Sequence, residues 1–128
     1  MAAIKPLVVI NGLVRELPAS SATDRPAVAV GYAAAVTLDC DSADVFDVTL
    51  TGNTTISLSG GVDGRLVVLR ITQGGAGGFI ASWGAMVRFG SDLTSAVLTT
   101  ATGKMDKVGL RLHAASGKYD VDALIKGF

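Results

Sequence analysis

Alternating apolar and polar residues occupy much of the chain from residue 45 onward. Residues 45–51 alternate, with Val48 and Leu50 on one face, and residues 54–59 repeat the pattern. A period of two is typical of a half-buried β-strand. The glycine-rich stretch at residues 60–64 separates these segments from the next one and indicates a turn.

Residues 65–73 differ because they carry apolar side chains on both faces, as expected of a central strand. If the alternate positions from Val67 to Ile71 face the core, Leu66 and Val68 face the other way. Leu124 is likewise expected to lie outward, among the polar residues of the last strand. Apolar residues on nominally exposed faces indicate a second packed surface, either a subunit contact or a surface covered by the N-terminal segment.

The rest of the chain also favours strands, and no segment shows sustained helical periodicity. An Asn-Gly pair at positions 11 and 12 predicts a tight hairpin near the N-terminus. Residues 27–36 fit either a short helix or a strand. In the last strand we expect Tyr119, Val121, Ala123 and Ile125 to point inward. The remaining expected strands lie at residues 7–10 and 13–14, within 79–89, and at 96–101, 107–114 and 118–125.

About nine short strands, separated by turn signals, predict an all-β fold. The specific prediction is an antiparallel β-sandwich of jelly-roll type. We expect a single domain over residues 1–128, because a chain of this length can bury one adequate core. Residues 1–26 form an expected N-terminal hairpin and loop, which is a candidate docking segment.

Composition and charge narrow the classes of function. The chain is 49% hydrophobic and only 17% charged, so partners are expected to cover part of its apolar surface. Eleven basic and eleven acidic residues balance, which argues against a general nucleic-acid binder. No secretory signal or apolar run of membrane-helix length is present, so no membrane insertion is expected. Cys40 is the only cysteine, which excludes an intrachain disulfide and fits a reducing cytoplasm.

Candidate catalytic groups are few, and we expect no enzyme activity and no cofactor. His113 is the only histidine and Glu16 the only glutamate, so few acid–base pairs are available. His113 is expected on the polar face of a strand. The glycine run at residues 74–78 lacks the Lys-Ser/Thr pair of a phosphate-binding loop and is expected to be a flexible hairpin loop.

Two other candidate sites have competing interpretations. Four aspartates, which are potential oxygen ligands for calcium, lie close together, although a solvated turn is the favoured interpretation and no metal site is assigned. They are Asp39, Asp41, Asp44 and Asp47. Trp83 and Tyr32 are candidates for stacking on a glycan, although core packing is favoured for Trp83.

A longer pattern resembles a known family. The run "LTGNTTISLSGGVDGRLVVLRITQGGAGGFIASWGAMVRFG" is similar to a segment of small tail-fibre, head-fibre and decoration proteins of tailed bacteriophages. The opening "KPLVVINGLVRELP" and the closing "VGLRLHAASGKYDVDALIKGF" resemble that family's start and end. The shared residues are mainly turns and core positions.

The resemblance implies a virion structural protein made in the host cytoplasm. Without a long fibre shaft, the chain is expected to be a complete short protein, most concretely a capsid decoration or head-fibre subunit. Its implied partners are the major capsid protein or other virion proteins, together with its own copies as a homotrimer. Leu66, Val68 and Leu124 are the candidate interface residues. The alternative is a tail or tail-fibre module that recognises a host-surface glycan.

Overall fold

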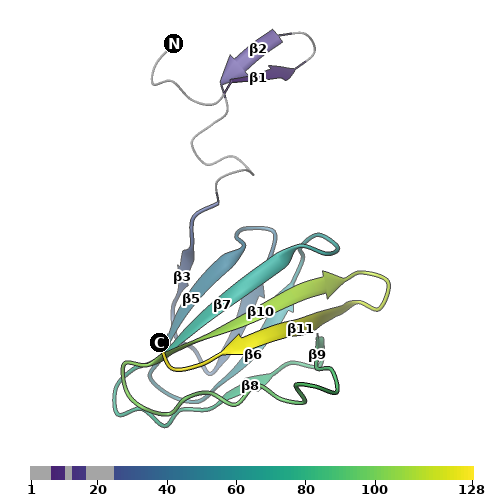
Figure 1. Cartoon of the computed structure of the whole chain (residues 1–128). Coiled ribbons are helices and arrows are strands. Elements are labelled where there is room, and N and C mark those ends of the chain that lie inside the picture. The colour runs from purple at the N-terminus through teal and green to yellow at the C-terminus, as the bar shows by residue number, and fades with distance from the viewer. Residues whose placement is uncertain (1–6, 11–12, 17–24) are drawn as a thin grey trace.

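The computed structural model describes residues 7–10, 13–16 and 25–128, with side chains from Arg25 onward. These residues form strands and no helix, so the fold is all-β, as predicted (Figure 1). The strands are β1 (Leu7–Ile10), β2 (Leu13–Glu16), β3 (Val28–Val30), β4 (Ala35–Asp39), β5 (Val45–Leu50), β6 (Thr54–Ser59), β7 (Leu66–Gln73), β8 (Ala81–Trp83), β9 (Val87–Arg88), β10 (Met105–His113) and β11 (Lys118–Ile125).

Nine of these strands make two sheets that share one core. The larger sheet has the order β3-β5-β7-β10-β11-β9, and the smaller has the order β4-β6-β8. The smaller sheet lies behind the larger one in Figure 1, and buried side chains from both belong to a single hydrophobic cluster. Strands β1 and β2 form the predicted antiparallel hairpin as a separate two-stranded sheet.

The prediction of antiparallel pairing is wrong for most of the two sheets. From β3 to β8 the chain passes to the other sheet after every strand, so strands that neighbour one another within a sheet run in the same direction. The pairs β3–β5, β5–β7, β4–β6 and β6–β8 are all parallel. Parallel neighbours need a crossover connection, and here the strand of the opposite sheet provides it.

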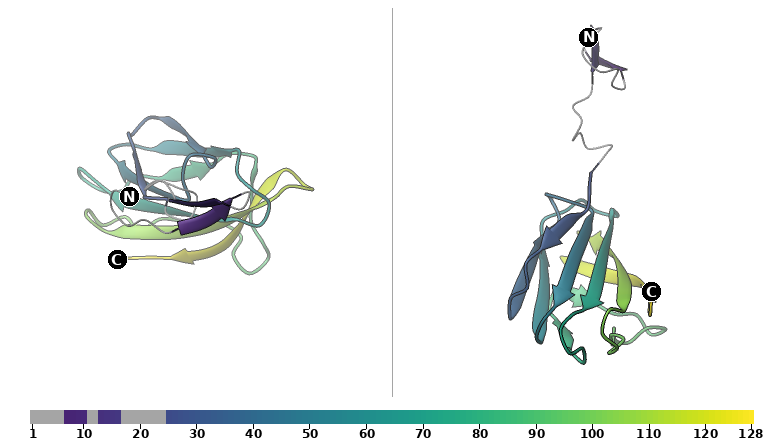
Figure 2. Two further views of the ribbon diagram at one scale, coloured as in Figure 1. Left: turned by 90° about the horizontal axis from the view of Figure 1, so that it is seen from above. Right: turned by 90° about the vertical axis from the view of Figure 1, so that its left-hand side faces the viewer.

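The result is a short coil of three rungs. We call β3 with β4 the first rung, β5 with β6 the second, and β7 with β8 the third. Asn53 ties the rungs together at one corner: its backbone carbonyl accepts the Tyr32 hydroxyl at 2.8 Å, and its side-chain Oδ1 accepts the Ile80 N–H at 2.9 Å. Figure 2 shows the earliest strands of the coil, in blue, at the opposite margin from the C-terminal strands.

An antiparallel hairpin closes the coil beyond the third rung. Strand β10 pairs with β7 on one side and with β11 on the other. Asp106 is 1% exposed and fixes the adjoining segments, since its carboxylate accepts the Thr99 N–H at 2.6 Å and the Gly127 N–H at 2.9 Å. This end of the larger sheet is therefore held by buried polar contacts as well as by strand pairing.

Several local predictions need correction. Residues 27–36 contain β3 and the start of β4 and no helix, whereas residues 96–101 form no strand, although Ala96 and Leu98 are buried. The glycine run at 74–78 joins β7 to β8 in the other sheet, so it is not a hairpin loop. Gly77 has a φ of 73°, and a Cβ there would lie 2.5 Å from the Thr100 carbonyl oxygen, so only glycine fits.

The predicted outward position of Leu124 is also wrong. A bulge shifts the register of β10 and β11 between Gly109 and Leu110. One extra residue exchanges the two faces of a strand. Leu124 therefore aligns with buried Val108 and packs against the core, while Ala123 and Ile125 become exposed.

Candidate functional site

An apolar hollow lies on the outer face of the larger sheet, which is the face turned away from the smaller sheet. It has a volume of about 260 Å³. Strand register explains its composition, because Val68 aligns with Gly109 and Gly109 with Ala123. We call it the outer-face hollow. Its apolar lining is Leu66, Val68, Gly109, Ala123 and Ile125.

The floor of the hollow is open because Gly109 has no side chain. A Cβ at this position would meet only Leu66 Cδ1, at an ordinary contact distance of 3.5 Å. Leu66 is 40% exposed and Ile125 is 55% exposed, although both side chains are large and apolar. Such a patch on a sheet face is typical of a surface that packs against another protein.

Most charged residues that border the hollow are paired, and Lys107, which also lines it, lies over the Phe128 ring at 4.5 Å. Arg111 donates to the Asp122 carboxylate at 2.7 Å and to the Gly64 carbonyl at 2.8 Å. Across the same sheet face, Arg70 makes a two-point contact with Asp47 at 2.5 and 2.6 Å. The border therefore offers fixed charge pairs of both signs rather than one attractive sign.

The same pairing extends to every arginine from Arg25 onward, since each lies within 4 Å of an aspartate oxygen. In the Arg88–Asp120 pair, the hydrogen bond from Arg88 holds the pKa of Asp120 below its ordinary value. Phosphate recognition needs unengaged basic side chains gathered on one surface. The described arginines do not provide such a surface.

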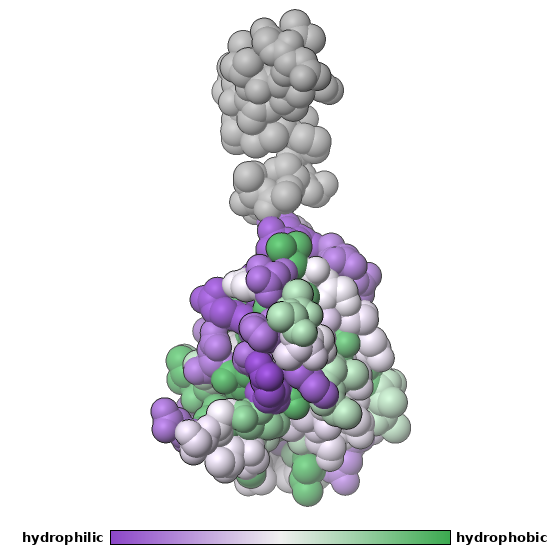
Figure 3. Space-filling model, turned by 90° about the vertical axis from the view of Figure 1, so that its right-hand side faces the viewer, coloured by the Kyte–Doolittle hydropathy of each residue, from purple (hydrophilic) through white to green (hydrophobic). Residues whose placement is uncertain are grey.

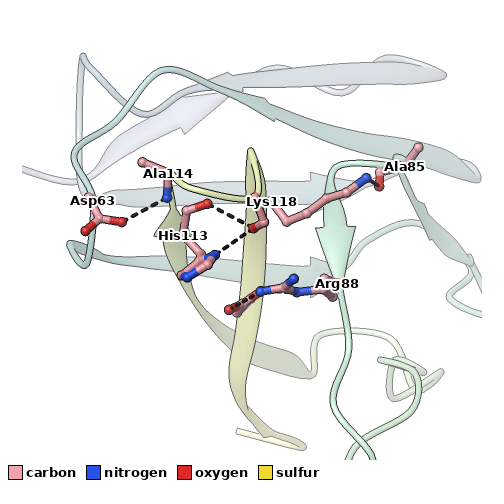
Figure 4. Close-up of polar contacts among 8 residues, drawn as sticks. Asp63, Ala85, Arg88, His113, Ala114 and Lys118 are labelled. Atoms are coloured by element: carbon pink, nitrogen blue, oxygen red, sulfur yellow. Dashed lines mark hydrogen bonds and ion pairs between the residues drawn. The ribbon is translucent and has the colours of Figure 1, made fainter.

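His113 is the last residue of β10 and is exposed, as predicted for the polar face of a strand (Figure 4). Its Nδ1 is 2.7 Å from the hydroxyl oxygen of Ser116, which also donates to the His113 carbonyl at 3.0 Å. Asp63 accepts the Ala114 N–H beside them at 2.8 Å. These contacts are local to the turn, and Figure 3 shows hydrophilic residues gathered on the face that carries it.

The four aspartates proposed as calcium ligands point to separate partners. Asp39 and Asp41 accept backbone N–H groups of Asp41 and Gly61 at 3.0 and 2.9 Å. Asp44 lies 3.5 and 3.6 Å from two arginines, and Asp47 binds Arg70. Within the described residues, no group of three or more potential metal ligands comes together.

The two candidate glycan-stacking residues lie apart and are already engaged. Trp83 is half-buried, packs edge-on against Phe89 at 6.3 Å, and donates its indole N–H to the Ala96 carbonyl at 3.3 Å. Tyr32 is 39% exposed at the corner of the first rung. Neither residue lines the outer-face hollow.

A second apolar surface, which the pattern of alternation did not reveal, lies at the first rung. Strands β3 and β4 are each at the end of their sheet. Residues 27–29 and 31–35 are exposed although almost all are apolar. A signal was present in the sequence, because residues 26–38 contain no charged side chain.

Comparisons with protein-family models, curated proteins and solved structures find no match to this chain. None of the described residues forms a helix long and apolar enough to cross a membrane.

Proposed function

We propose that this chain is a non-enzymatic virion structural protein of a tailed bacteriophage, most concretely a capsid decoration or head-fibre subunit. The outer-face hollow is the observation that carries the proposal, because it exposes large apolar side chains while its bordering Arg111 and Asp122 are paired with each other. The sequence resemblance supplies the setting. The partners are the major capsid protein or other virion proteins and further copies of this chain.

Self-association through the outer-face hollow is part of this proposal, with a homotrimer as the expected state. Leu66 and Val68 are the predicted interface residues that line the hollow, and Ala123 and Ile125 take the place of Leu124. Apolar burial contributes roughly 25 cal/mol per Å², so several such side chains at one contact give a useful driving force. Because the contact is mostly apolar and Arg111 is already paired with Asp122, association is expected to depend weakly on salt.

The finer description of the fold belongs to the same proposal. One core shared between two sheets supports a β-sandwich. The jelly-roll connection stays a prediction, and the parallel pairs from β3 to β8 do not favour it, because jelly rolls are built from antiparallel strands.

A light-scattering measurement of mass tests self-association. Leu66→Asp places a charge in the hollow and should convert the oligomer to monomer. Val62→Asp is the matched control, because Val62 is 56% exposed and lies outside the hollow. A wild-type monomer at high concentration, or an equal effect of both substitutions, would contradict the proposed interface.

Phage heads depleted of this protein test the particle role. A ligand that binds only the assembled shell stabilises it by about 2.7 kcal/mol per site at a hundredfold excess over Kd. Depleted heads should still assemble but rupture at a lower temperature, and added protein should restore them at low and high salt. Depleted heads as robust as complete ones would rule out the stabilising role.

The glycan-binding alternative receives less support, because Trp83 and Tyr32 do not share a groove. A glycan array with wild type and Trp83→Ala decides it. Saturable binding to one glycan, lost in a folded Trp83→Ala variant, would replace the decoration proposal with the receptor-binding one.

A further inference from the structure

The first rung of the coil leaves two strand edges without a partner among the described strands. Strand β3 pairs only with β5, and β4 pairs only with β6. An edge of this kind presents unpaired backbone N–H and C=O groups that can bind another strand. Stacked repeat folds normally need a polar terminal unit to cover such an end.

The first rung also lacks the usual protection of an open edge. Natural edge strands commonly carry lysines or inward-pointing charges that prevent pairing with other chains. The first rung contains no lysine, and its one charged residue is Asp39 at the end of β4; five of the thirteen residues 26–38 are alanines. Small uncharged side chains permit close approach of another backbone, so this edge fits an added β-strand.

The N-terminal hairpin also lacks a partner among the described strands. Strands β1 and β2 pair with each other and with no other described strand (Figure 1). Their sequences, LVVI and LVRE, contain six apolar residues out of eight. A single two-stranded hairpin is marginally stable in water, so these strands need a further surface to pack on.

We propose that residues 7–16 of one copy add to the open edge of the first rung of a neighbouring copy. Strand addition would supply backbone hydrogen bonds to the edge and bury apolar residues on both sides. The described body begins at Arg25, three residues before β3, so in the sequence the hairpin of each copy precedes its own open rung. Where two copies meet at this end, a donor and an acceptor are both present.

Exchange between copies is open to the chain because, among the described strands, the hairpin and the first rung are not paired with each other. A reciprocal exchange between two copies gives a closed dimer, and an exchange in which each copy donates to the next generates a closed ring if the rotation between copies allows it. The balanced charge of the chain adds little long-range repulsion to the encounter. The inference goes beyond the proposed function and does not depend on a capsid.

Thiol cross-linking of the purified full-length protein tests this exchange. One preparation carries Val14→Cys in the hairpin and a second carries Ala29→Cys in β3, and the two are mixed and treated with a short bifunctional maleimide. The native Cys40 is 1% exposed, and burial raises the pKa of its thiol to about 11, so it reacts slowly at neutral pH. Val97→Cys replaces Ala29→Cys in the control, because Val97 is 65% exposed and lies near β8 at the opposite edge of the smaller sheet.

Cross-linked heterodimers of the Val14→Cys and Ala29→Cys preparations should exceed those of the Val97→Cys control several-fold. Equal yields would overturn the proposal, as would the absence of heterodimers. A chain that carries both Val14→Cys and Ala29→Cys provides the other arm. If cross-links form only within that chain at high dilution, the hairpin covers its own rung and exchange between copies is wrong. Circular dichroism of each variant checks that the fold is retained.

Discussion

The two ends of the three-rung coil differ in how they are covered. At the third rung, β7 is paired with β10, and a buried Asp106 holds the segments on either side. At the first rung, β3 and β4 end their sheets with apolar residues exposed. In the larger sheet the chain thus covers the third rung with its own strand β10 and leaves β3 of the first rung uncovered, while in the smaller sheet both β4 and β8 are edge strands.

The difference does not arise from residue type alone. Both ends are rich in small and β-branched residues. The third rung is followed in the chain by the β10–β11 hairpin, and β10 pairs with β7 of that rung. Strand β10 lies antiparallel to β7, so it ends the parallel series of the coil, and β11 pairs along its other side. The first rung has only the N-terminal hairpin before it.

The largest expected effect is a difference between two identical truncations. Val108→Ala at the closed end removes two methyl groups from a side chain that is 0% exposed, and should cost about 2–3 kcal/mol of unfolding free energy. Val30→Ala at the open end should cost less than about 1 kcal/mol, because Val30 is only half-buried. Urea denaturation of dilute protein measures both. Equal costs would mean that the open end is as well packed as the closed one.

Removal of the buried charge at the closed end is expected to have the next largest effect. Asp106→Asn weakens the hydrogen bonds to Thr99 and Gly127 and should cost about 2 kcal/mol. The control is Asp92→Asn in the exposed connection between β9 and β10, with an expected change within about 0.5 kcal/mol. Thermal melting of the two variants side by side makes the comparison, and indistinguishable melting temperatures would contradict it.

The loss of stability at alkaline pH tests the burial of Cys40, the residue that directly follows β4. Burial raises the pKa of Cys40 from 9.0 to about 11, so between these values the folded chain keeps a proton that the unfolded chain loses. Stability is therefore fully present below about pH 9 and falls as the pH rises to about 11, by about 1–2 kcal/mol from this group. Cys40→Ala should flatten the pH dependence in this window. An unchanged slope in Cys40→Ala would show that the thiol does not contribute.

The smallest expected effects come from two tyrosine hydroxyls. Tyr119 donates to the Gly60 carbonyl at 2.6 Å and is 5% exposed, so Tyr119→Phe should cost about 1–1.5 kcal/mol. Tyr32 makes a similar bond at the first rung but is 39% exposed, so Tyr32→Phe should cost about 0.5 kcal/mol. Chemical denaturation with both variants measures the difference. A larger cost for Tyr32→Phe than for Tyr119→Phe would contradict this comparison of the two ends.

The sequence was a good guide where alternation was strict. The faces of β5, β6 and β7 are as predicted, because burial on one face fixes the side-chain period. The parallel pairing could not be predicted, since alternation shows which face is buried but not which strand lies next to it. The pattern of β11 was interpreted as continuous, and the bulge opposite Gly109 and Leu110 moved Leu124 inward and Ile125 outward.

The candidate surfaces are predictable only where the pattern of a single strand reveals them. Leu66 and Val68 were found because apolar residues occupied both faces of one strand. Gly109 was not found, because its contribution is the absence of a side chain beneath its neighbours. The only sign of the open first rung in the sequence is the lack of charge over residues 26–38, and secondary-structure propensity does not report it.

Hydrogen exchange of the full-length protein at two concentrations tests the central claim most directly. If another copy completes the open rung, the amides of β3 and β4 exchange rapidly in dilute solution and become protected as the concentration rises. The amides of β7 and β10 are expected to remain protected at both concentrations, because they belong to the closed end. Equal protection of β3 and β10 in dilute solution, or protection of β3 that does not change with concentration, would contradict the account.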